Sequence, residues 1–322
     1  MHVDVDIGER SKRSARQGLN GARGAAGMGI LDGKTAVVTG STRGLGLAIA
    51  EAYVREGAAV MLCGRSQETL QSALSDLQHR GQRATGIVAD VGNLADVKRI
   101  AEQAGETFGR IDIWVNNAGV AGVYGPTAAL DPAVVERGIR TNILGVYYGS
   151  IVAIQRFLAQ DTSGKLINIL GRGDHKPVPL QNAYAPTKAW VYSFTDALAR
   201  EYRDERIGVY MLNPGLMDTE LMREITVIQG FEEKVKPLAT VMRLWANPPA
   251  TPAEKAVWLA SPATDRKTGL ESRALTAAGI AGGLWRYATR WLLRRPVPEI
   301  TLDIHSVAPY RVMGRAPAEA EV

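Results

Sequence analysis

The chain has 322 residues, of which 46% are hydrophobic and 22% are charged, and these proportions are typical of a soluble globular protein. Its apolar runs fall far short of the roughly 20 residues that a membrane-spanning helix needs. The net charge is +5, but Arg and Lys are dispersed without an aromatic-interleaved basic module, which favours an anionic small molecule over nucleic acid as the partner. The single Cys63 cannot form an intramolecular disulfide, so we expect a reducing compartment and a cytoplasmic protein.

The composition divides the chain into three parts. Residues 1–29 are rich in Gly, Ala and Arg and lack the pattern of a secretory signal, so we expect a disordered basic tail. Residues 30–279 are expected to form one domain, in which 218–251 is a covering segment. In the C-terminal extension, 280–322, residues 285–295 interleave aromatic and Leu side chains with Arg and predict an amphipathic helix. We expect this helix to pack on its own domain or a second subunit rather than on a membrane.

From Lys34 onward, short apolar runs alternate with longer segments of helical period, a pattern typical of βαβ units. The predicted strands are Thr35–Thr39, Ala58–Cys63, Arg83–Ala89, Ile111–Val115, Lys165–Leu170, Ile207–Leu212 and Glu271–Ala277. The predicted helices are Gly44–Glu56, Ser66–Arg80, Asn93–Phe108, Pro132–Leu158, Ala183–Glu205, an irregular helical stretch Asp218–Ala246, and Pro252–Ala260. The sequence therefore predicts an α/β fold, a single Rossmann-type domain whose doubly wound parallel sheet carries helices on both faces.

A glycine-rich turn connects the first predicted strand to the first helix. Glycines allow a tight turn and a close approach to a pyrophosphate, whose negative charge the unpaired N–H groups and the helix dipole favour. The turn therefore predicts a dinucleotide site. The contacts expected from it are Gly40, Ser41, Thr42, Arg43, Gly44, Leu45 and Gly46.

The end of the second predicted strand indicates which dinucleotide binds. Cys63-Gly64-Arg65-Ser66 occupies the place where the adenosine ribose should lie, and it lacks the carboxylate that binds the ribose hydroxyls of NAD. Arg65, together with Arg43 of the glycine turn, instead offers fork-shaped donors to a 2′-phosphate. We therefore predict NADP(H) rather than NAD(H), with Arg65 and Ser66 among its contacts.

Further motifs follow the glycine turn in a fixed order. They are Asp90-Val91, Asn116-Asn117-Ala118-Gly119, Asn142, Tyr184-x-x-x-Lys188, Pro214-Gly215 with Thr219, and Trp258-Leu259-Ala260-Ser261 through Thr268-Gly269. Together with the spacing Gly40-x-x-x-Gly44-x-Gly46, they resemble the short-chain dehydrogenase/reductase family from about Leu31 to Gly269.

This resemblance implies roles for the matching residues. Asp90 and Val91 would meet the adenine ring, and the turn Asn117, Ala118 and Gly119 would line the cofactor. Pro214, Gly215 and Thr219 would contact the nicotinamide carboxamide. The resemblance also implies a homodimer or homotetramer that uses the helix carrying Tyr184 and Lys188.

A spacing of four places Tyr184 and Lys188 on one helix face, where the ammonium can lower the pKa of the phenol. Tyr184 would then act as the general acid or base while a hydride moves between the nicotinamide and a carbonyl or alcohol carbon of a small, apolar substrate. Residues 30–279 would thus form a dinucleotide-binding catalytic domain, in which 218–251 covers the substrate. By resemblance, Lys188 would also hold the nicotinamide ribose, and Asn142 would fix a water that connects Lys188 to solvent.

One position departs from the family pattern. The family normally has a serine thirteen residues before the tyrosine, to donate a hydrogen bond to the reacting oxygen, and here that residue is Gly171. Losing such a donor can cost about 2.7–4 kcal/mol of transition-state stabilisation. We expect Gly171, Arg172 and Asp174 to face the substrate, with Asp174 or His175 replacing the donor, or with substrate or water using the space beside Gly171.

Three hypotheses follow from this departure. The chain is an NADP(H)-dependent oxidoreductase, or an enzyme of the same fold that performs acid–base elimination or isomerisation, or a non-catalytic NADP(H)-binding regulator or scaffold. Retention of Asn142, Tyr184 and Lys188 favours the first. The histidines show no ligand spacing with Cys or carboxylates, so no metal is predicted.

Overall fold

The computed structural model describes residues 29–78, 83–160, 162–276, 279–283, 285, 289 and 300–311. The predicted basic tail up to residue 28, and the predicted amphipathic helix apart from residues 285 and 289, lie outside these ranges. Within the ranges, no helix combines the length and the apolar character needed to cross a lipid bilayer.

Seven parallel strands form the central sheet, in the order β3-β2-β1-β4-β5-β6-β8. Their bounds are β1 Thr35–Val38, β2 Ala59–Gly64, β3 Ala84–Val88, β4 Ile113–Asn116, β5 Gly164–Ile169, β6 Ile207–Asn213 and β8 Leu270–Arg273. The winding direction reverses between β1 and β4, and in such sheets ligands bind in the crevice at the carboxyl ends of the strands beside the reversal. The predicted doubly wound fold is confirmed, and the glycine turn follows β1 at this crevice.

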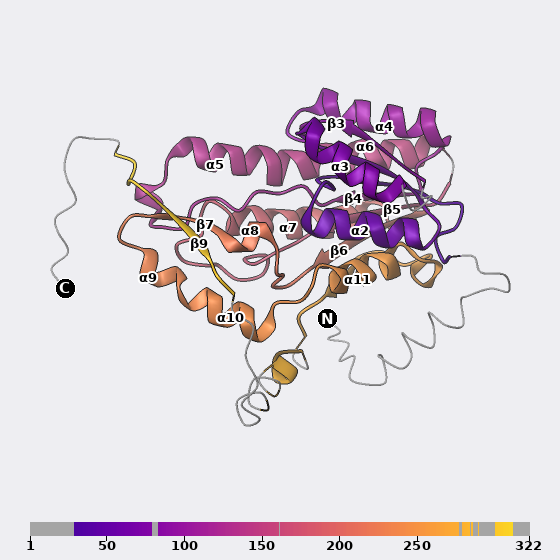
Figure 1. Cartoon of the computed structure of the whole chain (residues 1–322). Helices are drawn as coiled ribbons and strands as arrows, with labels where there is room; N and C mark the ends of the chain where they lie inside the picture. The colour runs from indigo at the N-terminus through magenta and orange to yellow at the C-terminus, as the bar shows by residue number, and fades with distance from the viewer. Residues whose placement is uncertain are drawn as a thin grey trace.

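Helices cover both faces of the sheet (Figure 1). One layer is α2 Gly44–Arg55, α3 Gln67–Gln78 and α11 Ala250–Ala260, and the other is α4 Leu94–Phe108, α6 Gly145–Ala159 and α7 Ala185–Glu201. Val37 and Val38 of β1 are fully buried in opposite cores, as continuously apolar parallel strands require.

The predicted helix Pro132–Leu158 is interrupted in the structure. It consists of α5 Pro132–Gly138, a π-helical turn Ile139–Leu144, and α6. Such π turns are rare and occur mostly at functional sites. Asn142, the asparagine singled out in the sequence, lies within this turn and is fully buried.

The prediction of a helical Asp218–Ala246 is partly wrong. After α8 Glu220–Arg223 the chain forms a strand, β7 Glu224–Ile228, before α9 Glu232–Val235 and α10 Pro237–Trp245. β7 pairs in parallel with β9 Asp303–Val307, in the C-terminal extension. Its β-branched residues, such as Ile225 and Val227, favour a strand once such a partner exists. The pairing joins residues far apart in sequence, so local periodicity does not reveal it.

Candidate active site

The glycine turn is fixed against the end of β4. The side-chain amide of Asn117 donates to the carbonyls of Thr39 and Gly40, at 2.9 and 3.0 Å. A Cβ at Gly46 would lie 2.2 Å from the Gly40 carbonyl oxygen and 2.4 Å from Nδ2 of Asn117, so only glycine fits there. Gly40 and Gly44 also have positive φ angles of 61° and 57°, which favour glycine.

The amino end of α2 is suited to an anion. Its N-cap residue, Arg43, makes no side-chain capping bond within the described part of the chain, so the first N–H groups of the helix are left for a ligand. Ser41 is fully buried and donates to the carbonyl of Val38 at 2.7 Å, which holds the turn from behind. Leu45 is buried and anchors the start of the helix.

The ribose end of the predicted cofactor site lies where expected. A Cβ at Gly64 would lie 2.5 Å from Cγ2 of Thr42, so the glycine turn packs on the end of β2. The next residues, Arg65 and Ser66, are exposed there. Arg43 forms an ion pair of 2.7 Å with Glu220 of α8, and both side chains are about two-thirds exposed. Sequence reasoning missed Glu220, because only the fold brings the two residues together.

The predicted adenine loop and the turn after β4 lie at the same edge of the sheet. Asp90 follows β3, and its carboxylate accepts the backbone N–H of Gly92 at 2.9 Å. Val91 is buried, and a Cβ at Gly145 would meet its Cγ2 at 2.7 Å. Gly119, in the turn after β4, lies close to the π-helical turn, since a Cβ at Gly119 would lie 3.4 Å from Oδ1 of Asn142.

The loop after β6 brings a buried hydroxyl to this edge. Gly215, after Pro214, has a φ of 68° and donates its N–H to Asn213 at 2.9 Å. Thr219 lies beside the glycine turn, and a Cβ at Gly44 would be 3.9 Å from its Cγ2. Its Oγ1 is buried and has no hydrogen-bond partner among the described residues. An orphaned buried hydroxyl fits a site that a ligand's polar group completes, as predicted for the carboxamide.

Tyr184 and Lys188 lie at the start of α7, next to the end of β5. Lys188 is buried, its Nζ donates to the carbonyl of Ile169 at 3.0 Å, and it lies 5.7 Å from the centroid of the Tyr184 ring. A buried chain of amides supports α7 from behind: Asn116 donates to Asn168 at 2.8 Å, and Asn168 donates to Thr195 of α7 at 2.9 Å. The pair therefore sits on a rigid part of the sheet.

Asn142 joins this pair to the turn after β4. Its side-chain amide exchanges hydrogen bonds with the backbone of Val120, at 2.9 and 3.0 Å, and donates to the hydroxyl of Thr187 at 3.1 Å. The amide is thus engaged with protein groups. The side chain of Asn142 therefore holds the loop beside Lys188, and the water that we expect there stays a prediction.

The electrostatics of the pair differ from the sequence-based expectation. Burial raises the pKa of Tyr184, and the negative charge of Asp174 raises that pKa further. Burial also lowers the pKa of Lys188 to about 8, against a smaller opposing effect of Asp174. Desolvation therefore outweighs the predicted lowering of the phenol pKa by Lys188 in this structure. A phenol that holds its proton is suited to the role of proton donor.

The phenol of Tyr184 occupies the place of the missing side chain. A Cβ built on Gly171 would lie 2.4 Å from Oη of Tyr184, and 3.4 Å from Cγ and Cε of Lys188. The hydroxyl thus rests against the bare Cα of Gly171. The expectation that water or substrate uses the space beside Gly171 is not met, because the tyrosine fills it.

Asp174 and His175 do not replace the serine donor here. The buried carboxylate of Asp174 accepts hydrogen bonds from Asn213 at 2.7 Å and from Arg273 at 3.0 Å. A carboxylate in these bonds is an acceptor, not a donor. The imidazole of His175 points to Glu271, with Nε2 3.2 Å from the carboxylate. Arg172 is exposed.

These acidic groups also bear on metal binding. Ligand atoms of Asp174, His175 and Glu271 lie within 4.8 Å of one another. The guanidinium of Arg273 bonds to both carboxylates, at 3.0 Å to Asp174 and 2.5 Å to Glu271. The cluster therefore already holds a cation. The prediction that the protein binds no metal stays a prediction.

A parallel sheet wound in two directions, with a glycine turn and a Tyr–Lys pair at its carboxyl edge, defines a class of dinucleotide-dependent oxidoreductases. The model of the short chain dehydrogenase family matches residues 34–228. The chain belongs to this family of oxidoreductases, which use a nicotinamide dinucleotide as cofactor.

Relatives and solved structures agree with this assignment. The 3beta-hydroxysteroid dehydrogenase 1 of Eggerthella lenta is 34% identical over 80% of this chain and 95% of that protein. The match to the uncharacterized oxidoreductase YxnA of Bacillus subtilis, also 34% identical, spans 57% of this chain and only about half, 52%, of that longer protein. An actinorhodin polyketide ketoreductase solved with NADPH has a TM-score of 0.69 at 26% identity, covering 76% of this chain and 97% of that one. A 3-ketoacyl-(acyl-carrier-protein) reductase of Brucella melitensis, solved with NADH, has a TM-score of 0.66 at 29% identity, with the same coverage.

The lowered pKa of Lys188 predicts a pH-dependent stability. Unfolding returns this lysine to its ordinary pKa of 10.5, so between about pH 8 and pH 10 the unfolded chain binds more protons than the folded one. Stability contributed by this group therefore rises with pH in that window. Relative to Lys188→Met, the wild type should gain about 1–2 kcal/mol of unfolding free energy between pH 7.5 and 9.5, measured by urea denaturation. Lys98→Met, at an exposed position of α4, is the matched control, and an equal difference at both pH values would contradict the burial argument.

Proposed function

We propose that the protein transfers a hydride between NADP(H) and a carbonyl or alcohol carbon of an apolar organic substrate, with Tyr184 as general acid and base. The observation that carries this proposal is the Tyr184 phenol beside the buried Lys188, on the carboxyl edge that also holds the glycine turn. The dinucleotide supplies the hydride. Tyr184 donates the proton of its hydroxyl to the carbonyl oxygen, so that carbonyl and reduced dinucleotide become alcohol and oxidised dinucleotide.

The surroundings of Tyr184 set the protonation state from which it starts. The raised pKa keeps the phenol protonated before reaction, and Asp174 disfavours the phenolate by its charge. Lys188, with Nζ held by the carbonyl of Ile169, is placed to return a proton to the phenolate afterwards. Its pKa of about 8 matches that task near neutral pH.

The substrate side offers one polar anchor. Gln181, three residues before Tyr184, has a buried side-chain oxygen without a hydrogen-bond partner among the described residues. Burying an unpaired acceptor costs about 1–3 kcal/mol, so a substrate that donates a hydrogen bond there gains affinity. Because a relative that matches 80% of this chain is named as a 3β-hydroxysteroid dehydrogenase, we use a 3-ketosteroid as the turnover probe, alongside simple ketones, quinones and imines.

The choice of NADP(H) rests on Arg65 and Arg43, which flank the ribose end of the site.

We further propose a cytoplasmic homodimer or homotetramer. The buried thiol of Cys63 fits a reducing compartment, and α6 and α7 present an aromatic surface that includes the exposed Tyr147 and the stacked rings of Trp190 and Phe194. Sedimentation equilibrium tests the oligomeric state, and a monomer at all concentrations would exclude an oligomer. Cell fractionation tests the cytoplasmic location.

Replacing the phenol tests the proposed chemistry. Tyr184→Phe should lower kcat for the 3-ketosteroid by roughly 10²–10⁴-fold, because the general acid is lost, while leaving the Kd of NADPH within about twofold. Stopped-flow kinetics and NADPH fluorescence titration measure the two quantities. Tyr147→Phe, on the exposed face of α6, is the control. Unchanged turnover in Tyr184→Phe would exclude the tyrosine as acid and favour a different chemistry on the same fold.

The cofactor preference depends on two arginines. Arg65→Ala and Arg43→Ala should each weaken NADPH binding by roughly 10- to 100-fold, since a charge-assisted hydrogen bond contributes about 1.5–3 kcal/mol, and should leave NADH binding unchanged. Arg55→Ala, an exposed arginine at the far end of α2 paired with Glu254, is the control. Equal effects on both dinucleotides would refute the preference.

Gly171 allows steric and hydrogen-bonding effects to be separated. Gly171→Ala introduces a Cβ that the phenol must avoid, and a displacement of about 1 Å can cost roughly 100-fold in rate. Gly171→Ser brings the same Cβ with a hydroxyl donor. We expect both variants to have a lower kcat than the wild type, and the serine variant to exceed the alanine variant. Wild-type kcat in Gly171→Ala would show that the phenol does not need this place.

A further inference from the structure

The described end of the C-terminal extension returns to the substrate-covering segment. β9 lies parallel to β7, with His305 opposite Thr226 and Val307 opposite Ile228. The pairing continues one residue further, where the N–H of Gln229 donates to the carbonyl of Val307 at 2.9 Å. Figure 1 shows the yellow β9 lying along β7, between the orange helices α9 and α8. We name residues 302–311 the strap.

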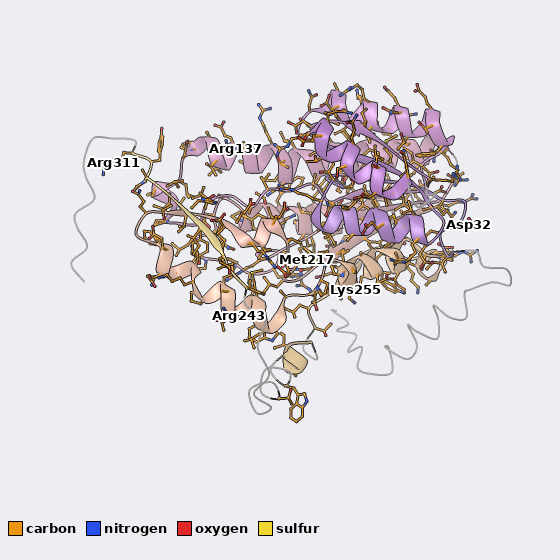
Figure 2. All side chains as sticks on the ribbon, viewed as in Figure 1. Asp32, Arg137, Met217, Arg243, Lys255 and Arg311 are labelled. Carbon is orange, nitrogen blue, oxygen red and sulfur yellow. The ribbon has the colours of Figure 1, made fainter. Side chains whose placement is uncertain are left out.

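Two further contacts fasten the strap on either side of β7. The hydroxyl of Ser306 donates to the carboxylate of Glu232, in α9, at 2.6 Å. The N–H of Tyr310 donates to the carbonyl of Ala129, in the 3₁₀ turn Thr127–Ala129 before α5, at 3.0 Å. The strap therefore ends on the same side of the molecule as α5, as the labels of Arg311 and Arg137 in Figure 2 show. It bridges the covering segment and the loop that follows β4.

On its other edge, β7 leads directly to the catalytic tyrosine. The backbone of Tyr124 accepts from Ile228 and donates to Thr226, both at 2.9 Å, and the next N–H, of Gly125, donates to the carbonyl of Leu180 at 2.8 Å. Ile228 is buried in one apolar cluster with Ala183, the residue before Tyr184. β7 is thus the middle member of a chain of contacts that runs from the strap to the loop 180–184.

From this chain of contacts we infer that the strap is a positioning element of the substrate site: β9 holds β7 against the loop 180–184 and so keeps the covering segment closed over Tyr184. The inference rests on the proposed function for its catalytic part. The dinucleotide half of the site, formed by β1, β2 and the glycine turn, has no contact with the strap in the hydrogen bonds and strand pairings of the described residues. Because the strap makes no direct contact there, its release should change the KM of the substrate more than the Kd of the dinucleotide.

The strap is built to release more easily than the core. Four of the five side chains of β9, including His305 and Val307, are exposed, so backbone hydrogen bonds rather than apolar burial hold the strand. Segments with few buried contacts open locally at low free energy. Opening of the strap would free one edge of β7 while the seven-stranded sheet stays intact, which provides a route for substrate entry.

The test removes one backbone donor from the strap. In a strand, the N–H and C=O of one residue point to the same side and successive residues alternate. The carbonyl of Val307 faces β7, so the N–H of His305 faces β7 too, and that of Ser306 faces away. His305→Pro therefore deletes a bond to β7 at an exposed position. His305→Ala, which removes the same side chain but keeps the N–H, is the matched control.

Hydrogen exchange, trypsin digestion and kinetics of the full-length protein give the readouts. In His305→Pro alone, the N–H groups of Val227 and Gln229 should exchange about tenfold faster, and cleavage after Lys234 and Arg243 should accelerate, while exchange in β1 to β6 stays unchanged. KM for the 3-ketosteroid should rise several-fold with the Kd of NADPH within about twofold.

Equal exchange of the Val227 and Gln229 N–H groups in His305→Pro and His305→Ala would overturn the inference that the strap holds β7. Faster exchange in His305→Pro with an unchanged KM would overturn its role at the substrate site. Wild-type protein that binds no dinucleotide would instead end the proposed function, and exchange and proteolysis would then decide the strap by themselves.

Discussion

The active edge depends on how closely the glycine turn approaches the end of β4. The contact between Gly46 and the Gly40 carbonyl leaves no room for a Cβ, and the amide of Asn117 fixes two carbonyls of the turn at once. This arrangement turns the first N–H groups of α2 toward the crevice without a side-chain cap among the described residues. A helix end left open in this way is stabilised by an anionic ligand, so the fold and the binding of a dinucleotide have the same cause.

On the other half of the edge, the hydroxyl of Tyr184 fills the place that a side chain at position 171 would take. Gly171 lets the phenol of Tyr184 approach the backbone after β5. The carboxylate of Asp174, held by Asn213 and Arg273, adds a fixed negative charge nearby. Burial and this negative charge both raise the pKa of Tyr184 and so keep the phenol protonated. The departure from the family pattern therefore coincides with a phenol that rests against the backbone after β5 and stays protonated.

Much of this organisation could be predicted from the sequence, because it is written in local patterns. Buried parallel strands are apolar runs, and the crevice residues follow those strands directly, so Tyr184, Lys188 and the turn Gly40–Gly46 fall at one edge once the strand order is known. The ion pair between Arg43 and Glu220 could not be predicted, since exposed charges of this kind carry no pattern. The roles given to Asp174 and His175 failed for a related reason: their partners, in β6 and β8, are far away in the chain.

The pairing of β7 with β9 also escaped prediction, because it joins the end of the family match to the C-terminal extension. The family match ends at residue 228, the last residue of β7, whereas β9 begins at Asp303 in the extension. A strand at the border of the shared region must pair on both edges or leave backbone groups unsatisfied. Here Tyr124 satisfies one edge and the extension satisfies the other. The segment 218–251 is thus tied, through β7, both to the loop after β4 and to the C-terminal extension.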